Sequence, residues 1–581
     1  MKTPYWFNRQ NYTLSPLRIA FAGALISAAA AMALLAASTG ANVRVTNDND
    51  TTYVSADQLG GGTYTDAVLL RCGTDRRQQN EPALAIDPRN PSVWTSGAND
   101  DCTVPLVGDG WAGFYRSSDG GTTWTDSLLP GYKGDASTEG TSSPLHQLVA
   151  GGALAAGDPQ QAWDAHGNLF YMGNNFNRGI ENGVSGTTRD NTGVIWVATY
   201  KPSNPVDTST DGSKYVRTVV LATNTFGLGS FNDKTSLAVD PVTGNVYAAW
   251  SDFHGDGCNE ILFSRSTDHG VTFSPPLKIS SGVCVNQGPS IVIGLAGQVH
   301  VSWEAIAVTP VGPAGAAFAS STDFGKTFSK ARIVVTYTPF LSRRFSGNGA
   351  RDCGDGPFAC PTGFTFPRFD AFPSLAADNA HGTLVMAVQV AQSSGQGQIE
   401  FMVSTDGGTT WSSLKRLAPS STGHQFFPFL VASGGRVNAI WYDSRGDSNY
   451  SPTRPPCNSA SGHTSACLNV RYAESTDGGN TWGSSIRVTD TATNLNFEQF
   501  GTRRVPFFGD YITVAAQGDT IGAAWTDQRN TVGASDISGD NDGADVKGDP
   551  ETGGKCTSSS STCFDKTGGL DQNIYAATIT P

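Results

Sequence analysis

The sequence predicts an all-β chain that folds as a seven-bladed β-propeller, with four strands in each blade and the ring closed by an N-terminal strand. Three observations lead to this prediction. The composition favours a fold of strands and tight turns, because 68 of 581 residues are glycine and only 15% are charged, against about 7% and 25% in average proteins. One turn motif occurs five times along the chain. One hairpin pattern occurs seven times.

The turn motif reads Ser-x-Asp-x-Gly-x-Thr-aromatic and lies between short apolar runs. Its five copies, called the Ser–Asp turns below, are residues 117–124, 266–273, 321–328, 404–411 and 475–482. We expect the Ser and Asp side chains to bond the turn backbone, the glycine to supply a positive φ, and the aromatic ring to pack under the hairpin. Each copy therefore predicts the turn between the third and fourth strands of one unit.

The second repeat is a strand, a polar turn and another strand that often ends in Trp and Asp. Its seven copies begin at Ala83, Gln161, Ser236, Ser290, Ser374, Phe429 and Tyr511. Units repeating about every 74 residues are typical of a propeller. The last unit stops after its third strand, at 573–577. We expect residues 67–70 to supply the missing strand, so that no sheet edge stays open.

Together these motifs resemble the Asp-box (BNR) repeats of the sialidase-like superfamily. The resemblance implies one propeller domain over residues 63–581. That family includes sialidases, other glycoside hydrolases and non-enzymatic propellers, so it implies the fold more strongly than an activity. Sialidases have six blades and an Arg-Ile-Pro motif in the first blade. This chain has seven repeats, and Arg76-Arg77 precedes Gln-Gln-Asn-Glu81 at the corresponding place.

The N-terminal segment indicates export. Lys2, Arg9 and Arg18 precede an uncharged apolar run over 19–37, and this order predicts a signal peptide within residues 1–41. The alternative is an uncleaved membrane anchor, since about 19 apolar residues are just long enough to span a bilayer. Residues 42–62 are polar and Gly-rich and predict a flexible linker. We therefore expect a secreted or extracytoplasmic protein, which contacts a membrane only through the N-terminal segment and only if that segment is not cleaved.

The ten cysteines occur in close pairs, which indicates disulfides and an oxidising compartment. Neighbours in the chain predict the pairs Cys72–Cys102, Cys258–Cys284, Cys353–Cys360, Cys457–Cys467 and Cys556–Cys563. All ten lie in loops of one face of the ring, where first strands begin and second strands end; we call it the top face. The Ser–Asp turns lie on the opposite, bottom face. Holding long loops in place explains the disulfides, and long loops on one face are also typical of a binding site.

Polar side chains gather on the top face, and the resemblance implies a carbohydrate site there. Glycoside hydrolysis uses two carboxyl groups as acid and base or nucleophile, and arginines bind an acidic sugar through paired hydrogen bonds. The catalytic candidates are Glu81, Asp100, Asp443, Tyr511 and Asp527, with Tyr511 beside Glu81 as a sialidase-type nucleophile and one of the three aspartates as acid/base. The substrate-binding candidates are Arg368, Arg445, Arg529, Asp510 and Asp252, the three arginines as a carboxylate clamp.

Two alternatives remain open. The motif Trp-x-Asp-x-Arg at Trp441 and Trp525 is also explained by an Asp–Arg pair that pins neighbouring blades. For the whole chain, the leading prediction is a sialidase-like glycoside hydrolase, and the alternatives are a polysaccharide lyase and a non-catalytic propeller that binds glycans or proteins at the cell surface. The formal charge of −13 argues against nucleic acid as a partner, because phosphate binding needs a basic face.

No cofactor is expected apart from one candidate for a structural calcium ion. Ser538, Asp540, Asp542 and Asp549 place oxygen ligands at the spacing of a calcium loop. The alternative is an acidic, solvated insertion. The eight histidines are dispersed and show no paired spacing for zinc.

Overall fold

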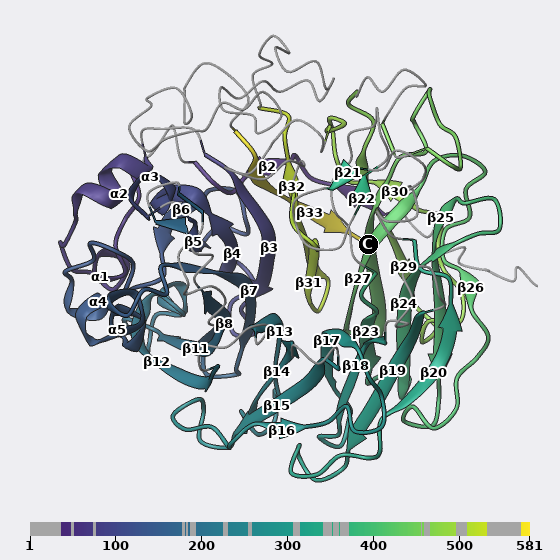
Figure 1. Ribbon diagram of the computed structural model, residues 1–581, viewed down its shortest axis with the longest axis horizontal. Coiled ribbons are helices and arrows are strands. Elements are labelled where there is room, and N and C mark those ends of the chain that lie inside the picture. The colour runs from purple at the N-terminus through teal and green to yellow at the C-terminus, as the bar shows by residue number, and fades with distance from the viewer. Residues whose placement is uncertain are drawn as a thin grey trace, which may run out of the picture. The chain divides into compact units, whose positions relative to one another are not determined.

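The computed structural model divides the chain into two units, residues 1–36 and 37–581, and the description that follows concerns the second. The described residues are 37–47, 52–73, 77–107, 109–176, 180–181, 184–185, 193–224, 231–253, 258–305, 314–340, 351–352, 359–360, 371–454, 456–457, 465–494, 508–530 and 571–581. They form seven antiparallel four-stranded blades in a ring, which confirms the predicted fold (Figure 1).

In blades 1 to 6 the strands follow one another in the sequence from the centre of the ring outward. Blade 1 contains β3 (Gln79–Ile86), β4 (Trp94–Asp100), β5 (Trp111–Ser117) and β6 (Thr125–Leu128). Blade 2 contains β7 (Ala155–Trp163), β8 (Leu169–Phe176), β11 (Val194–Lys201) and β12 (Lys214–Thr223). Blade 3 contains β13 (Phe231–Val239), β14 (Val246–Phe253), β15 (Glu260–Ser266) and β16 (Leu277–Lys278). Blade 4 contains β17 (Asn286–Ile293), β18 (Val299–Ala305), β19 (Ala314–Ser321) and β20 (Arg332–Tyr337).

The remaining three blades complete the ring. Blade 5 contains β23 (Ser374–Asp378), β24 (Thr383–Ala391), β25 (Gly397–Ser404) and β26 (Lys415–Arg416). Blade 6 contains β27 (Gln425–Ser433), β28 (Arg436–Asp443), β29 (Asn469–Ser475) and β30 (Ile486–Arg487). Blade 7 contains β31 (Thr513–Gln517), β32 (Thr520–Asp527) and β33 (Asn573–Thr580). The first strands contact one another in the closed order β3, β7, β13, β17, β23, β27, β31 and back to β3, and Figure 1 shows them around the centre.

Blade 7 is completed by residues close to the start of this unit. β1 (Ser38–Thr39) and β2 (Val43–Arg44) pair antiparallel with β33. The closing strand is therefore N-terminal, as predicted, but the prediction of 67–70 for this place is wrong. Those residues begin helix α2 (Ala67–Cys72), because the Asp66 side chain caps it by accepting hydrogen bonds from the amides of Val68 and Leu69.

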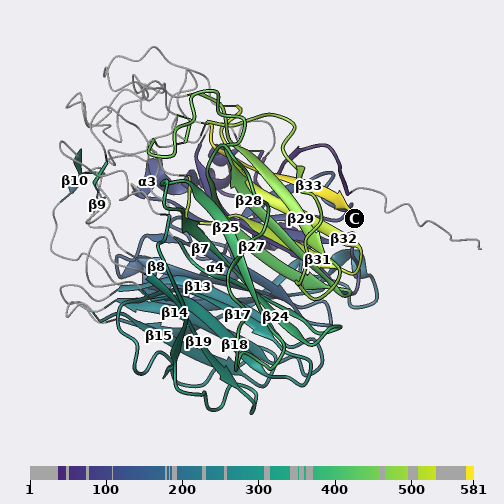
Figure 2. The same ribbon diagram turned by 90° about the vertical axis from the view of Figure 1, so that its right-hand side faces the viewer.

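Short elements surround the blades. Helix α1 (Ala56–Leu59), which lies with β2 inside the predicted linker 42–62, packs on β12 together with α4 (Thr138–Ser142) and α5 (Pro144–Ala150). Helix α3 (Val104–Val107) follows β4, and a small hairpin is formed by β21 (Arg351–Asp352) and β22 (Ala359–Cys360). A second hairpin, β9 (Ile180–Glu181) and β10 (Val184–Ser185), stands off the blade sheets (Figure 2). Within the described residues, the helices are all too short or too polar to cross a membrane.

The five Ser–Asp turns connect third and fourth strands, as predicted. In blade 4, Ser321 Oγ donates to Asp323 Oδ1 (2.7 Å), and the Gly325 amide donates to Ser321 Oγ (2.9 Å). The amide and hydroxyl of Thr327 donate to the Asp323 carboxylate at 2.9 and 2.6 Å. The same four bonds recur in the other copies. Each turn is therefore locally specified by its own residues.

Three of the predicted disulfides are formed, Cys72–Cys102, Cys258–Cys284 and Cys457–Cys467. Cys353, Cys556 and Cys563 lie outside what the structure describes, so the predicted pairs Cys353–Cys360 and Cys556–Cys563 stay predictions. The core lies between adjacent sheets and contains fully buried tryptophans. Their indoles find local acceptors: Trp250 donates to Asn232 (2.9 Å), and Trp303 donates to Asn286 (2.6 Å).

Candidate functional site

A β-bulge recurs near the top-face end of the first strands. Register shifts occur at equivalent points of β3, β7, β13, β17 and β27. The bulged residue has a positive φ at Glu81 (58°), Asp158 (52°) and Lys234 (52°). This conformation costs about 1–2 kcal/mol for a residue with a Cβ, and a bulge re-aims the side chain that it contains. Three consecutive blades thus turn an ionisable side chain toward the same place.

Five residues from four blades meet there: Glu81, Asp158, Asp233, Lys234 and Asp510, called the central acidic cluster below. Lys234 Nζ bonds Asp510 Oδ2 and lies 3.8 Å from Asp233 Oδ2 and 4.0 Å from Asp158 Oδ1. The Asp510 amide donates to Glu81 Oε1 (3.1 Å), and the Lys234 amide donates to Asp158 Oδ2 (3.1 Å). One ammonium group therefore faces a set of four carboxyl groups.

The protons of the cluster are unevenly shared. Burial raises the pKa of Glu81 well above its usual range, and the nearby Asp158 carboxylate raises it further. Burial likewise raises the pKa of Asp233. Burial also acts to raise the pKa of Asp158, but Lys234 and hydrogen bonds from Asp233 and Glu81 outweigh it and hold that pKa below its usual value. Within the cluster, the pKa values of Glu81 and Asp233 are thus shifted upward and that of Asp158 downward, so Asp158 is the carboxyl group that ionises most readily.

Neighbouring groups fix these side chains in position. Asn99 Nδ2 donates to Glu81 Oε2 (3.0 Å), and Asn174 Nδ2 donates to Asp158 Oδ2 (3.1 Å). Gly509 has a φ of 89°, and a Cβ there would lie 2.5 Å from Glu81 Cγ. Only glycine fits this close approach of two blades.

The cluster lies at the top end of the central channel, which has a volume of about 460 Å³ and is lined by the first strands of all seven blades. Lys234, Asp510 and Tyr511 are among its lining residues. The Asp510 side chain is fully buried, whereas 19% of the Asp233 side chain is exposed and Tyr511 is partly exposed. The pKa of Tyr511 is raised well above its usual range, mainly by burial and also by the nearby Glu81 carboxyl group. Tyr511 is therefore a partly exposed residue of the channel lining, and Asp233, which is not among the lining residues, is the most exposed of the carboxyl groups that contact Lys234.

Asp443 and Arg445, both predicted site residues, bind each other. Arg445 Nη2 and Nε donate to Asp443 Oδ2 and Oδ1 at 2.7 and 2.9 Å, and Trp441 Nε1 donates to Oδ2 at 3.1 Å. Gln425 Nε2 adds a bond of 3.1 Å. The Asp443 carboxylate is 1% exposed, so its oxygens are occupied within one blade.

Asp527 and Arg529 repeat this arrangement in blade 7. Trp525 Nε1 and Arg529 Nη2 donate to Asp527 Oδ2 at 2.9 and 2.7 Å. The Arg529 guanidinium also bonds Asp490, which follows β30 of blade 6, and lies 4.3 Å from the centre of the Tyr575 ring. In both copies of the Trp-x-Asp-x-Arg motif, the Arg and Asp side chains therefore bond each other within one loop. In blade 7 the Arg also bonds Asp490 of the neighbouring blade.

The other predicted residues lie apart from the central acidic cluster or outside the description. Asp100 is buried and accepts hydrogen bonds from the hydroxyls of Tyr53 (2.8 Å) and Tyr115 (2.7 Å). Asp252 accepts one from Asn224 Nδ2 (3.0 Å). The residues that fall outside the described part are Arg368, Ser538, Asp540, Asp542 and Asp549.

The structure brings Glu81, Asp510 and Tyr511 together, as the sequence suggested for Glu81 and Tyr511. Asp158, Asp233 and Lys234 were not among the predicted site residues. One signal could have found Asp158: Glu81-Pro82 and Asp158-Pro159 place an acid before proline at the same point of two first strands. Lys234 also has a positive φ that directs it into the cluster, but it is followed by Thr235 and not by proline, so the sequence carries no equivalent signal.

Neither a family model nor a curated protein matches this chain. Among solved structures it is similar to a Trypanosoma rangeli sialidase, with 12% identity over 71% of this chain and 59% of that chain and a TM-score of 0.39. An ulvan lyase shares 13% identity over 78% of this chain and 92% of its own (TM-score 0.39). A Penicillium chrysogenum α-L-arabinanase shares 12% identity over 60% of this chain and 93% of its own, with a TM-score of 0.32. The propeller architecture of the chain is shown by its own strand pairing, independently of these similarities.

Proposed function

We propose that the protein is an exported glycoside hydrolase that acts on glycans at the top face, with its reaction centre at the central acidic cluster. One observation supports this most: Glu81, Asp158 and Asp233 lie together around Lys234, and their pKa values are shifted in opposite directions, upward for Glu81 and Asp233 and downward for Asp158. A protonated carboxyl next to an ionised one is the combination that glycoside hydrolysis requires. In a non-catalytic binding surface, burying several carboxyl groups around one lysine would have a cost and no chemical use.

Each exposed group then has a role. Asp233 protonates the leaving glycosidic oxygen, since burial raises its pKa and it is the most exposed carboxyl of those with described contacts to Lys234. Tyr511 is the nucleophile candidate; because its pKa is raised, its proton must pass to a carboxylate as it attacks, and Asp158 is the ionised one. Lys234 and Glu81 position these groups through Asp158.

The charges favour a neutral sugar at the reacting position. Lys234 is the cation in the described interactions of Glu81, Asp158 and Asp233. Arg445 and Arg529, expected to clamp a sugar carboxylate, are bonded to aspartates of their own loops. An anionic sugar such as a sialoside would meet carboxyl groups without a free guanidinium partner among these residues.

The test is a screen of the full chain against neutral oligosaccharides, sialosides and uronate polysaccharides. Reducing ends report hydrolysis, and unsaturated sugars report a lyase. We expect hydrolysis of a neutral glycan, and Asp233→Asn should lower kcat by at least about 100-fold, the range of general-acid contributions. Asp519→Asn, the same change at an acid 89% exposed on the opposite face, is the control. Glycan binding without product, or full activity of Asp233→Asn, would overturn the proposal.

A further inference from the structure

We propose that Asp164, His166 and His269 bind a zinc ion on the bottom face, where it joins blade 2 to blade 3. Asp164 and His166 lie in the turn between β7 and β8, and His269 lies in the Ser–Asp turn 266–273 of the next blade. One ligand atom from each lies within 4.8 Å of the other two. Among the described residues, these three form the group of His, Cys, Asp or Glu side chains that is close enough together to hold a metal ion.

The donor set suits zinc rather than calcium. Two imidazoles and one carboxylate are ligands that zinc accepts, whereas calcium prefers oxygen alone. His166 Nδ1 and His269 Nδ1 lie 3.9 and 3.8 Å from Asp164 Oδ2. A tetrahedral zinc ion with bonds of about 2.0–2.1 Å separates its ligands by about 3.3 Å. Small rotations of the two histidines, whose side chains are 71% and 49% exposed, close this gap and leave the fourth position to water.

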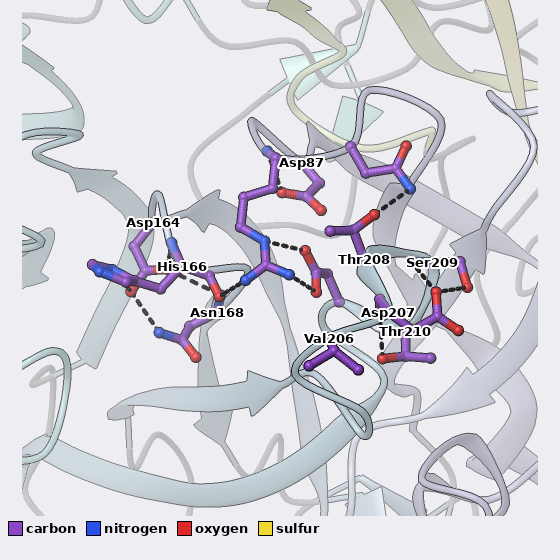
Figure 3. Close-up of polar contacts among 12 residues, drawn as sticks. Asp87, Asp164, His166, Asn168, Val206, Asp207, Thr208, Ser209 and Thr210 are labelled. Carbon is purple, nitrogen blue, oxygen red and sulfur yellow. Dashed lines mark hydrogen bonds and ion pairs between the residues drawn. The ribbon is translucent and has the colours of Figure 1, made fainter.

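The carboxylate is already held in place. Asp164 Oδ1 accepts the amides of His166 (2.8 Å) and Asn168 (3.0 Å), and Oδ2 accepts Asn168 Nδ2 (2.6 Å). Figure 3 shows Asn168 directed at Asp164 beside His166. The Asp164 side chain is fully buried, so its orientation is fixed by partners that a bound metal does not displace. Such supporting hydrogen bonds are what orient metal ligands in proteins.

The nearest described cation does not oppose a metal. The Arg89 guanidinium donates to the His166 carbonyl (3.0 Å), and it pairs with the Asp211 carboxylate at 2.9 and 3.0 Å. Its charge is therefore neutralised beside the site rather than directed at the ligand atoms.

Blades 5 and 6 contain the same arrangement with one ligand missing. His381 Nδ1 lies 2.7 Å from Asp378 Oδ2 in the turn between β23 and β24. The residue of the next Ser–Asp turn that faces this pair is Gly478, where a Cβ would lie 3.0 Å from His381 Cβ. Gly478 occupies the motif position that His269 occupies in blade 3. This pair is a matched control, because it has Asp and His but no second His.

The test is a zinc titration by calorimetry of the untagged full chain, with thermal unfolding measured alongside. His269→Gly removes a ligand without strain: His269 has a φ of 56°, and glycine stands at its position in three other Ser–Asp turns, with φ of 72°, 68° and 72°. We expect one zinc ion per chain and a zinc-dependent rise of Tm. His269→Gly should weaken binding at least about tenfold and remove the rise, while its metal-free Tm is unchanged or higher.

His381→Ala is expected to bind zinc like the unchanged chain, and calcium should produce no response. Failure of the unchanged chain to bind zinc, or equal binding by His269→Gly, would disprove the site. His269→Gly relieves a strained backbone, so we expect the variant to fold. A loss of zinc binding then reports the loss of the ligand.

Discussion

Lys234 of blade 3 and Asp510 of blade 7 form a buried ion pair across the top end of the central channel. The two blades are not neighbours, since β13 contacts β7 and β17 whereas β31 contacts β27 and β3. A buried pair contributes little net stability, yet it is costly to break, because the remaining charge has no partner. The pair therefore fixes the distance between two first strands that backbone hydrogen bonds do not join.

Replacing Lys234 with methionine should expose this dependence. We expect Lys234→Met to lower the free energy of unfolding by about 3–5 kcal/mol, the range for breaking a buried pair, and to abolish hydrolysis. Urea unfolding followed by circular dichroism measures the first. The double change Lys234→Met with Asp510→Asn should recover much of the stability and none of the activity. An unchanged unfolding midpoint for the single variant would contradict the role of the pair.

Asp443 is expected to affect stability rather than turnover. Asp443→Asn weakens the bonds from Arg445 and Trp441, so the free energy of unfolding should fall by about 1–3 kcal/mol while kcat stays within a few-fold. The informative comparison is with Asp233→Asn, the same chemical change inside the central acidic cluster. If Asp443→Asn abolished product release with unchanged stability, the acid would belong to the reaction centre after all.

The free energy of unfolding should depend on pH partly through the titration of Asp126. Burial raises its pKa from 3.8 to about 7, despite hydrogen bonds from Asn47. Because the folded carboxyl retains its proton, its contribution to the free energy of unfolding is complete below pH 4 and is lost as the pH rises through 7. Asp126→Asn should therefore reduce the fall in stability between pH 4 and 7 by roughly 2–4 kcal/mol.

Urea titrations at each pH unit from 4 to 8 measure this difference. Part of the dependence should persist in the variant, because burial and a hydrogen bond with Asp211 also raise the pKa of Asp87 to about 7. Parallel curves for the two proteins would show that Asp126 does not titrate in this range.

The closing strand should be essential to the ring. Val45 and Thr46 are fully buried, and Thr46 Oγ1 donates to Asn573 Oδ1 (3.0 Å). Deleting residues 37–47 removes these contacts and leaves the edge of β33 unpaired, so we expect a loss of at least about 3 kcal/mol and aggregation. Thermal unfolding with light scattering tests this, with a deletion ending at residue 36 as control. Equal Tm values for the two deletions would exclude the closure.

The repeats made the fold predictable because each Ser–Asp turn is a closed set of local bonds, such as those between Ser321, Asp323 and Thr327. The closing strand was misplaced because pairing of β1 and β2 with β33 is a contact between distant segments, and neither short strand has a pattern of its own. The closeness of Glu81 and Tyr511 could be predicted because both lie where first strands begin. The place of Lys234 in the cluster could not be predicted, because its direction depends on a bulge. Asp443 and Arg445 were predicted as separate site residues because both lie at the top end of a second strand, and the structure bonds them to each other.

The pairing of Ser38 with Thr580 has a consequence for biosynthesis. The two residues are separated by about 540 positions, which a ribosome covers in roughly half a minute to two minutes. Throughout that time the first segment of the ring to be made has no partner. β33 thus completes the fold, so a chain cut short between blade 6 and β33 would retain six blades and still be an open, aggregation-prone arc.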